Sequence, residues 1–261
     1  MSFPLQGVLH AGNTAETGKQ CWDARHTMTK PTLILTRPVE SAERFAEELS
    51  INMKARLDLL FSPLLEIVDL HVKVDLTAYA AVIFSSSNGV RFAPDGGKRV
   101  AYCIGQKTTG AAQRRGWDAR LMGSTAEQLV QNLAQTSLEG PILHLAGVHQ
   151  RGDVAGKLKS AGIEVHTVIV YDQRALSLTS EAKHAISSVE PCILPVFSPR
   201  TAEILASQIA DPRHFIAIAL SPSVAAPLVG LPFDKVLISD APTGAAIHKT
   251  IENLMLGPSL A

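Results

Sequence analysis

The chain has 261 residues, of which 46% are hydrophobic and 18% charged, and its 24 basic and 24 acidic side chains give a formal net charge of zero. This length suits one large domain or two small ones, and the apolar content is enough for a buried core, which excludes wholesale disorder. The charge balance excludes an overall positive charge that would attract nucleic acid to the molecule as a whole. We therefore expect no nucleic-acid partner, and an anionic ligand would need basic groups that are gathered locally.

The sequence contains no segment suited to cross a membrane. Its longest unbroken apolar run, residues 78–84, is far shorter than the ~20 residues of a transmembrane helix. The first thirty residues are polar and aperiodic, without a cationic region ahead of an apolar stretch, so we expect a flexible tail over residues 1–30 and no secretory signal. Cys21, Cys103 and Cys192 are too few and too widely spaced for a disulfide framework or a CxxC metal pair. These features favour a cytoplasmic protein without membrane contact.

Short apolar runs alternate with helical patterns along the chain, which is typical of a parallel α/β sheet. The first strand is expected at residues 32–35, and Pro38 suits the first turn of the helix that follows. The buried face of that helix is expected to hold Ala42, Phe45, Ala46 and Leu49. Further strands are expected at 80–84, 100–104, 142–145, 165–170, 193–197, 215–220 and 236–238, with helices that include 126–133, 154–161 and 245–254.

The second half of the chain repeats motifs of the first half in the same order. Phe84-Ser85-Ser86-Ser87-Asn88 corresponds to Phe197-Ser198-Pro199-Arg200-Thr201, and the segment 104–112 corresponds to 220–226. Gly116 and the segment 124–126 likewise have counterparts, at Gly230 and 242–244. Four correspondences at nearly constant spacing indicate two similar α/β modules.

Too little chain follows Ile193 to complete the second module, so its remaining strands must come from the N-terminal part. We expect residues 31–62 and 175–261 to form one discontinuous α/β domain, with 70–168 inserted as a second and 62–70 and 168–175 as connectors. The predicted fold class is therefore α/β, with two similar parallel-sheet, flavodoxin-like domains joined by a two-segment connector. Ligands of such folds bind at the carboxyl ends of the strands, so the active site is expected in a cleft between the domains.

The repeated motifs place small polar residues directly after strands, where helices begin. Ser86 and Asn88 follow one strand, and Ser198 and Arg200 follow another. Helix N-termini expose N–H groups and favour anions, but serines at these positions are also ordinary N-caps, and both interpretations remain open. Basic residues at strand ends could bind carboxylates or be solvated surface charges: Arg37, Lys107, Arg151 and Arg200.

Other motifs indicate little cofactor chemistry. Gly105-Gln106-Lys107-Thr108 lacks the spacing of a Walker loop, and no GxGxxG follows the first strand. The nine histidines show no pair at metal-ligand spacing on one face, so we interpret them as structural or surface groups. Tyr171 ends the apolar run 165–170; it could pack its ring in the interior or present its hydroxyl as a proton donor, and both interpretations stay open.

Taken in order, these motifs resemble the uroporphyrinogen-III synthase family. The similar segments run from about residue 31 to 256: 35–38 (LTRP), 84–90 (FSSSNGV), 104–108 (IGQKT), 161–165 (AGIEV), 170–171 (VY) and 197–200 (FSPR). The resemblance implies a lyase that cyclises hydroxymethylbilane, a linear tetrapyrrole rich in acetate and propionate groups. The reaction would invert the terminal D ring through a spiro intermediate and release water without a cofactor. A monomer is expected, with hydroxymethylbilane synthase, the neighbouring enzyme of the pathway, as a candidate partner.

The same resemblance assigns roles to individual residues. Tyr171 matches the family's cleft tyrosine and would be the catalytic proton donor. The substrate's carboxylates would be bound by strand-end N–H groups together with Arg37, Ser86, Asn88, Gly105, Lys107, Thr108, Ser198, Arg200, Ser221 and Ser223.

Two departures from the family pattern leave other functions open. Ser221-Pro222-Ser223-Val224 stands where the family often has Gly-Pro-x-Thr, and Ser87 replaces a frequent proline. The alternatives are a two-lobed tetrapyrrole or small-anion binding protein and a catalytically inactive homologue.

Overall fold

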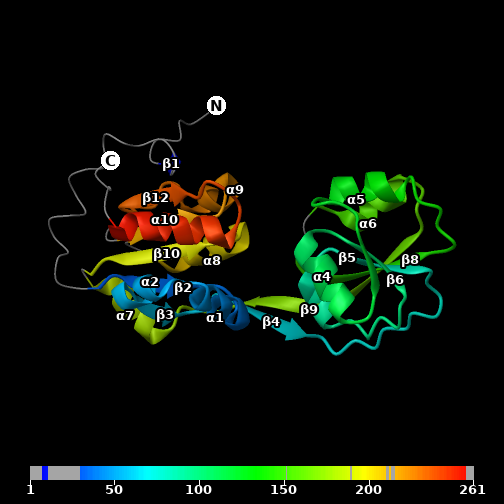
Figure 1. The fold of residues 1–261 in the computed structure, drawn as a ribbon, viewed down its shortest axis with the longest axis horizontal. Coiled ribbons are helices and arrows are strands. Elements are labelled where there is room, and N and C mark those ends of the chain that lie inside the picture. Colours follow the sequence, from blue (N-terminus) through cyan, green and yellow to red (C-terminus); the bar gives the residue numbers. More distant parts are fainter. Residues whose placement is uncertain are drawn as a thin grey trace. The chain divides into compact units, whose positions relative to one another are not determined.

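The computed structural model describes residues 8–10, 30–150, 152–188, 190–209, 212 and 215–256. The chain divides into two compact units: unit 1 is Met1–Glu66 with Ala175–Ala261, and unit 2 is Ile67–Arg174. Each unit contains one six-stranded sheet with helices packed on it (Figure 1). The predicted fold class, α/β with parallel sheets, is confirmed.

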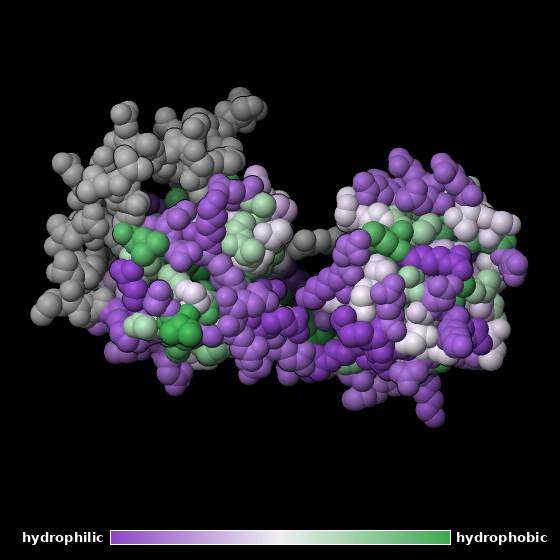
Figure 2. All heavy atoms as spheres, in the orientation of Figure 1, coloured by the Kyte–Doolittle hydropathy of each residue, from purple (hydrophilic) through white to green (hydrophobic). Residues whose placement is uncertain are grey.

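Hydrophilic side chains cover most of the face of each unit that is visible in Figure 2. Large apolar side chains that are exposed, such as Ile51 of a helix, Phe61 of a strand and Val148 of a loop, come from separate parts of the chain rather than from one long segment. The longest described helix has 13 residues, and none of the described helices is long and apolar enough to cross a bilayer.

Sheet 1 of unit 1 has the strand order β1-β12-β11-β10-β2-β3, and all its neighbouring strands run parallel. Its strands are β1 (Val8–His10), β2 (Thr32–Leu35), β3 (Asp58–Phe61), β10 (Cys192–Val196), β11 (Phe215–Ala219) and β12 (Lys235–Ile238). Its helices are α1 (Val39–Glu47), α2 (Ile51–Arg56), α7 (Ser180–Ser187), α8 (Pro199–Gln208), α9 (Pro222–Ala225) and α10 (Gly244–Leu256), with a 3₁₀ turn at Ala226–Leu228.

Strand β1 lies within the segment for which the sequence predicts a flexible tail. Of residues 1–30, the structure describes Val8–His10 and Lys30. The backbone of Val8–His10 pairs with β12, which would otherwise be the edge of the sheet, so the tail prediction is wrong for these three residues. The rest of the predicted tail lies outside the described residues.

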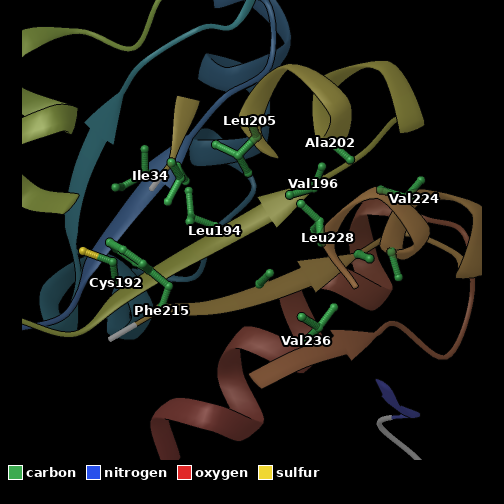
Figure 3. Close-up of a cluster of buried hydrophobic side chains, with 14 of the residues drawn as sticks. Ile34, Cys192, Leu194, Val196, Ala202, Leu205, Phe215, Val224, Leu228 and Val236 are labelled. Atoms are coloured by element: carbon green, nitrogen blue, oxygen red, sulfur yellow. The ribbon is translucent and has the colours of Figure 1, made fainter. Parts of the chain in front are cut away.

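The core of unit 1 forms on both faces of sheet 1, because successive side chains of a strand point to opposite faces. Ile34 and Leu194 pack with Leu205 of α8 on one face (Figure 3). Leu33 packs with Phe45 of α1 on the other face, which α2 and α10 also cover. Coverage on both faces explains why these strands read as continuous apolar runs in the sequence.

Sheet 2 of unit 2 has the strand order β4-β9-β8-β5-β6-β7. Its strands are β4 (Leu65–Asp69), β5 (Ala81–Phe84), β6 (Val100–Cys103), β7 (Asp118–Leu121), β8 (Ile142–Gly147) and β9 (Val165–Ala175). Its helices are α3 (Ser87–Arg91), α4 (Gln106–Arg114), α5 (Ala126–Leu133) and α6 (Val154–Ser160). Phe84 packs on the face covered by α3 and α4, and Ile83 packs on the face covered by α5 and α6.

The two sheets have the same arrangement in a permuted chain order. Sheet 1 contains the series β3-β2-β10-β11-β12, which is the flavodoxin-like order, and sheet 2 contains the matching series β9-β8-β5-β6-β7. The pair β2 and β3 precedes its three partner strands in the chain, whereas the matching pair β8 and β9 follows its own. The repeated sequence motifs follow matching strands, which confirms that the chain holds two similar modules.

The chain passes between the units inside two strands. It leaves unit 1 after Glu66, within β4, and returns after Arg174, within β9. These strands are neighbours in sheet 2, and both passages lie in the segments 62–70 and 168–175 for which the sequence predicts connectors.

Candidate functional site

Polar residues gather at the carboxyl edge of each sheet, where the parallel strands end and helices begin. We call the residues that follow β2, β10 and β11 edge 1, and the residues that follow β5, β6 and β8 edge 2. Edge 1 holds the predicted binding residues Arg37, Ser198, Arg200, Ser221 and Ser223, whereas edge 2 holds Ser86, Asn88, Gly105, Lys107 and Thr108. Each edge belongs to its own unit.

The serines of edge 1 follow two adjacent strands but have different local roles. Ser198 is the N-cap of α8; its Oγ accepts a hydrogen bond from the Thr201 N–H at 3.1 Å and lies 2.7 Å from Thr201 Oγ1. Ser221 precedes α9 without a side-chain cap bond, and its Oγ lies 3.0 Å from Ser223 Oγ. Capping therefore accounts for Ser198, whereas the Ser221 hydroxyl is not needed to cap a helix.

The departure at Val224 has a structural explanation. The Val224 side chain is 2% exposed and packs in the core of unit 1, so a hydroxyl at this position would point into the interior. Ser223, the adjacent residue, is exposed. The edge therefore keeps an accessible hydroxyl although the position of the family's threonine is apolar.

Arg37 follows β2 and stacks on an aromatic ring from the neighbouring strand end. Its Cζ lies 4.0 Å from the centroid of the Phe197 ring, and Phe197 in turn meets Phe45 edge-on at 5.1 Å between centroids. Burial lowers the pKa of the Arg37 guanidinium, and the nearby Arg44 lowers it further. No described residue forms a hydrogen bond or ion pair with Arg37, so the ring holds the face of the guanidinium and leaves its in-plane N–H donors for an anion.

Arg200 and Lys107 lie in the first turns of helices. Arg200 is half-buried at the start of α8, and Lys107 is exposed at the start of α4. Arg151, the fourth basic residue proposed from the sequence, lies outside the described residues.

Edge 2 is built from the beginnings of α3 and α4. Ser86 is the N-cap of α3, and its Oγ accepts a hydrogen bond from the Asn88 N–H at 3.1 Å. Gly105 is the N-cap of α4 and has a φ of 80°, a conformation that favours glycine. Thr108 is 6% exposed and lies in the interior, so its side chain is poorly placed to contact a ligand.

Tyr171 lies on β9, separated from β5 by β8. The residue is 3% exposed, and its ring lies over Gly147 of β8, where a Cβ would come within 2.4 Å of Tyr171 Cζ. No described residue accepts or donates a hydrogen bond at the Tyr171 hydroxyl. The interior therefore holds the ring, as the packing interpretation expects, while the hydroxyl retains its proton for another acceptor.

Two polar pairs at edge 2 were not predicted from the sequence. His149 Nε2 lies 3.6 Å from Oδ1 of Asp172, the residue that follows Tyr171 in the chain. His144, which is completely buried in β8, has its Nε2 at 3.0 Å from the Oγ of Ser85, the first residue after β5. The sequence signal for the second pair is a lone histidine within the apolar strand Ile142-Leu143-His144-Leu145.

The described residues include no group of three or more His, Cys, Asp or Glu side chains arranged for a metal ion. Burial raises the pKa of the Cys103 thiol to about 11 and that of the Cys192 thiol to about 12, so both remain thiols at neutral pH. Cys21 lies outside the described residues.

The chain is similar in sequence to one family model and in structure to solved members of the same family. Residues 47–249 match the family model described as uroporphyrinogen-III synthase HemD. A uroporphyrinogen-III synthetase from Helicobacter pylori is similar in structure, with 18% sequence identity and a TM-score of 0.62 over 87% of this chain and 100% of the other. A mutant uroporphyrinogen III synthase from Thermus thermophilus shows 16% identity and a TM-score of 0.52 with the same coverage. No curated protein sequence matches significantly.

Proposed function

Because the chain belongs to the uroporphyrinogen-III synthase family, we propose that it cyclises hydroxymethylbilane to uroporphyrinogen III, with inversion of the D ring and release of water. The observation that carries this proposal is the family match over residues 47–249, which includes all of unit 2 and the strands β10 to β12 of unit 1. Both polar edges lie largely within the matched region.

Formation of the reactive intermediate requires a weak acid. Loss of hydroxide from the bilane leaves a resonance-stabilised azafulvenium cation, so electron donation by the pyrrole already favours ionisation. We assign the proton donor to Tyr171, because phenols keep their proton at neutral pH and its hydroxyl is not engaged by any described residue. A single general acid contributes roughly 10²–10⁴-fold, which is sufficient for a substrate that ionises readily.

The selective step is positional. The linear substrate closes without an enzyme to the isomer whose D ring is not inverted, so the protein must hold ring D in the orientation for attack by its substituted carbon. We propose that the substrate's carboxylates bind the strand-end N–H groups and hydroxyls of both edges, with Arg37 as a planar donor on edge 1. Helix N-termini and serine hydroxyls bind carboxylates without a large local positive charge, which agrees with the formal net charge of zero.

The test is an isomer assay. Purified protein is incubated with freshly prepared hydroxymethylbilane, the products are oxidised, and the porphyrin isomers are separated by chromatography. The proposal expects isomer III, with isomer I in the control without protein. Isomer I alone in both samples would contradict it, and tight binding without turnover would instead support the two-lobed binding protein.

We also propose that the protein acts as a cytoplasmic monomer without a metal or organic cofactor, as the family resemblance implies. Activity that persists after dialysis against a chelator and a sedimentation mass near 27.9 kDa would support this description. We predict a direct contact with hydroxymethylbilane synthase, because that enzyme supplies the substrate.

A further inference from the structure

A buried histidine in sheet 2 has no part in the function proposed above. His144 lies in the middle of β8, opposite Ile83 of β5 and Thr167 of β9, and it is 0% exposed. Its neighbours along the strand, Leu143 and Leu145, are buried apolar residues. An imidazole in such a place destabilises the fold unless its nitrogens are hydrogen-bonded, so its presence needs an explanation.

One nitrogen of His144 is paired and the other is not. Nε2 lies 3.0 Å from Ser85 Oγ, whereas Nδ1 is buried and has no hydrogen-bond partner among the described residues. Ser85 follows Ile83 by two positions and therefore points to the same face of the sheet as His144. It is half-buried at edge 2 and directly precedes Ser86, the N-cap of α3.

The arrangement favours one tautomer of the imidazole. Burial lowers the pKa of His144 to about 4, so the ring is neutral near pH 7 and carries a proton on one nitrogen. A proton on Nδ1 would leave a buried N–H without an acceptor, whereas a proton on Nε2 leaves only a lone pair unsatisfied at Nδ1. Buried N–H groups without an acceptor are the rarer of the two in proteins, so the Nε2–H tautomer is preferred.

This tautomer determines what the Ser85 hydroxyl can do. If Nε2–H donates to Ser85 Oγ, the oxygen is an acceptor toward His144 and the Ser85 proton remains for another group. No described residue other than His144 forms a hydrogen bond with the Ser85 side chain. The hydroxyl is thus fixed in place as a donor at the edge where a carboxylate would bind.

We propose that His144 is a positioning residue: through its Nε2–H it holds Ser85 so that the Ser85 hydroxyl donates a hydrogen bond to a carboxylate of the substrate. The identity of the ligand rests on the proposed function, whereas the tautomer of His144 and the orientation of Ser85 do not. Ser85 thereby becomes a further proposed binding residue of edge 2.

The first experiment measures the tautomer directly in the folded full-length protein. Long-range ¹H–¹⁵N correlation spectra report which ring nitrogen is protonated, and the His144 signals are assigned by their absence in His144→Gln. We expect the Nε2–H form at neutral pH. A proton on Nδ1 would overturn the proposal, whatever the activity of the protein.

The second experiment compares kinetic constants of variants in the isomer assay. Ser85→Ala is expected to raise KM about tenfold with little change in kcat, because a hydrogen bond to a charged group is lost in ground state and transition state alike. His144→Leu, which fills the site without a donor, should raise KM several-fold. His144→Gln should restore a KM near that of the wild type, because its amide N–H can replace Nε2–H. The matched control is Ser160→Ala, whose hydroxyl bonds Gly156 O within α6.

A purely structural role of His144 makes different predictions. If the role is purely structural, a His144→Leu variant that is folded, as judged by its thermal unfolding, has the KM of the wild type. That outcome would overturn the proposal. Coupling through one hydrogen bond also predicts that Ser85→Ala combined with His144→Leu is no worse than Ser85→Ala alone, whereas additive effects would contradict it.

Failure of the proposed function is distinguishable from failure of this inference. If the wild type forms no uroporphyrinogen III, the proposed function is wrong, and fluorescence titration with uroporphyrin III then replaces the assay. Weaker binding by Ser85→Ala and His144→Leu, together with the Nε2–H tautomer, would still support the inference. Equal binding by all variants would overturn it.

Discussion

Tyr171 combines interior packing with the role of proton donor that we propose for its hydroxyl. Its ring is buried over Gly147 and lies 6.1 Å from the Phe92 ring, whereas its hydroxyl contributes no hydrogen bond to the described fold. We therefore expect Tyr171→Phe to keep the thermal stability of the wild type and to lose about 10²-fold or more in kcat. Steady-state kinetics and thermal unfolding on the same samples measure both quantities.

Tyr79→Phe is the matched control for that variant. The Tyr79 hydroxyl also lies in unit 2, but it is bonded to His166 Nδ1 at 3.1 Å and belongs to neither edge. Its removal should leave kcat unchanged. Full activity of Tyr171→Phe would show that the proton comes from another group.

A comparison of Ser198 and Ser221, two serines of edge 1, can distinguish helix capping from ligand binding. Ser198→Ala removes the cap of α8 and should destabilise the protein by about 1 kcal/mol. Ser221 makes no cap bond, so Ser221→Ala should leave the free energy of unfolding unchanged and raise KM. Chemical denaturation and kinetics check the pair, and an equal loss of stability in both variants would contradict this division of roles.

The buried His144 makes stability depend on pH. Its pKa is about 4 in the folded protein and near its ordinary value of 6.5 in the unfolded chain, so between these values the unfolded state binds more protons. Above pH 6.5 His144 therefore does not lower the free energy of unfolding. As the pH falls from 6.5 to about 4, the free energy of unfolding decreases by on the order of 3 kcal/mol. His144→Leu should remove this part of the pH dependence, which denaturation at a series of pH values measures; an unchanged profile would contradict it.

At the scale of elements, a strand can be predicted from sequence when it is covered on both faces. The bounds predicted for β2 and α5 agree with the structure, because an apolar run marks the strand and Thr125 caps the helix. Strands β3 and β7 were not predicted, since edge strands such as Asp118–Leu121 are largely exposed and pair through their backbones. β9, which lies between β4 and β8, continues beyond residue 170 into the polar segment 172–174, which no apolar run marks in the sequence.

The sequence predicts which strand ends form the candidate site, but it does not predict which side chains of neighbouring strands contact each other there. Strand ends followed by serines, glycine and arginine locate both edges, because parallel strands bring their carboxyl ends to one side of a sheet. Ser85 and His144 contact each other across neighbouring strands but lie 59 positions apart in the sequence, so no local sequence pattern predicts the contact. The stacking of Arg37 on Phe197 depends likewise on the pairing of β2 with β10.

The irregularity in β8 connects element geometry with Tyr171. The register between β8 and β9 shifts at Ala146 and Gly147, and Gly147 has no side chain where the Tyr171 ring lies. Gly147→Ala would place a Cβ against this ring, so we expect a loss of about 1–3 kcal/mol in stability and reduced activity. Gly140→Ala, whose Cβ would meet nothing closer than Ala80 Cβ at 3.6 Å, is the control for thermal unfolding and kinetics. Equal stability of the two variants would contradict the packing argument.

At the scale of the whole molecule, the formal net charge of zero limits how an anionic ligand can be attracted, but not whether it can bind. It excludes long-range attraction of an anion by the protein as a whole. It does not exclude a polyanionic substrate, because the binding groups proposed for the edges are hydroxyls, N–H groups and a stacked arginine. Association should therefore depend only weakly on ionic strength.

Unit 2 is continuous in sequence and has apolar clusters on both faces of its own sheet. We expect a fragment of residues 65–175, which retains complete β4 and β9, to fold cooperatively by itself. Circular dichroism and ¹H–¹⁵N spectra overlaid on those of the full chain would test this expectation. A fragment without cooperative unfolding would show that unit 2 depends on unit 1.

The pairing of β2 with β10 has a consequence for protein synthesis. Leu33 and Ile193 are partners in sheet 1, yet the whole of unit 2 lies between them in the chain. As the polypeptide leaves the ribosome, unit 2 is completed first, while β2, α1 and β3 still lack the strands that cover Leu33 and Phe45. The N-terminal segment thus spends the longest time with its apolar residues unprotected, which makes it the part of the nascent chain that a chaperone would bind.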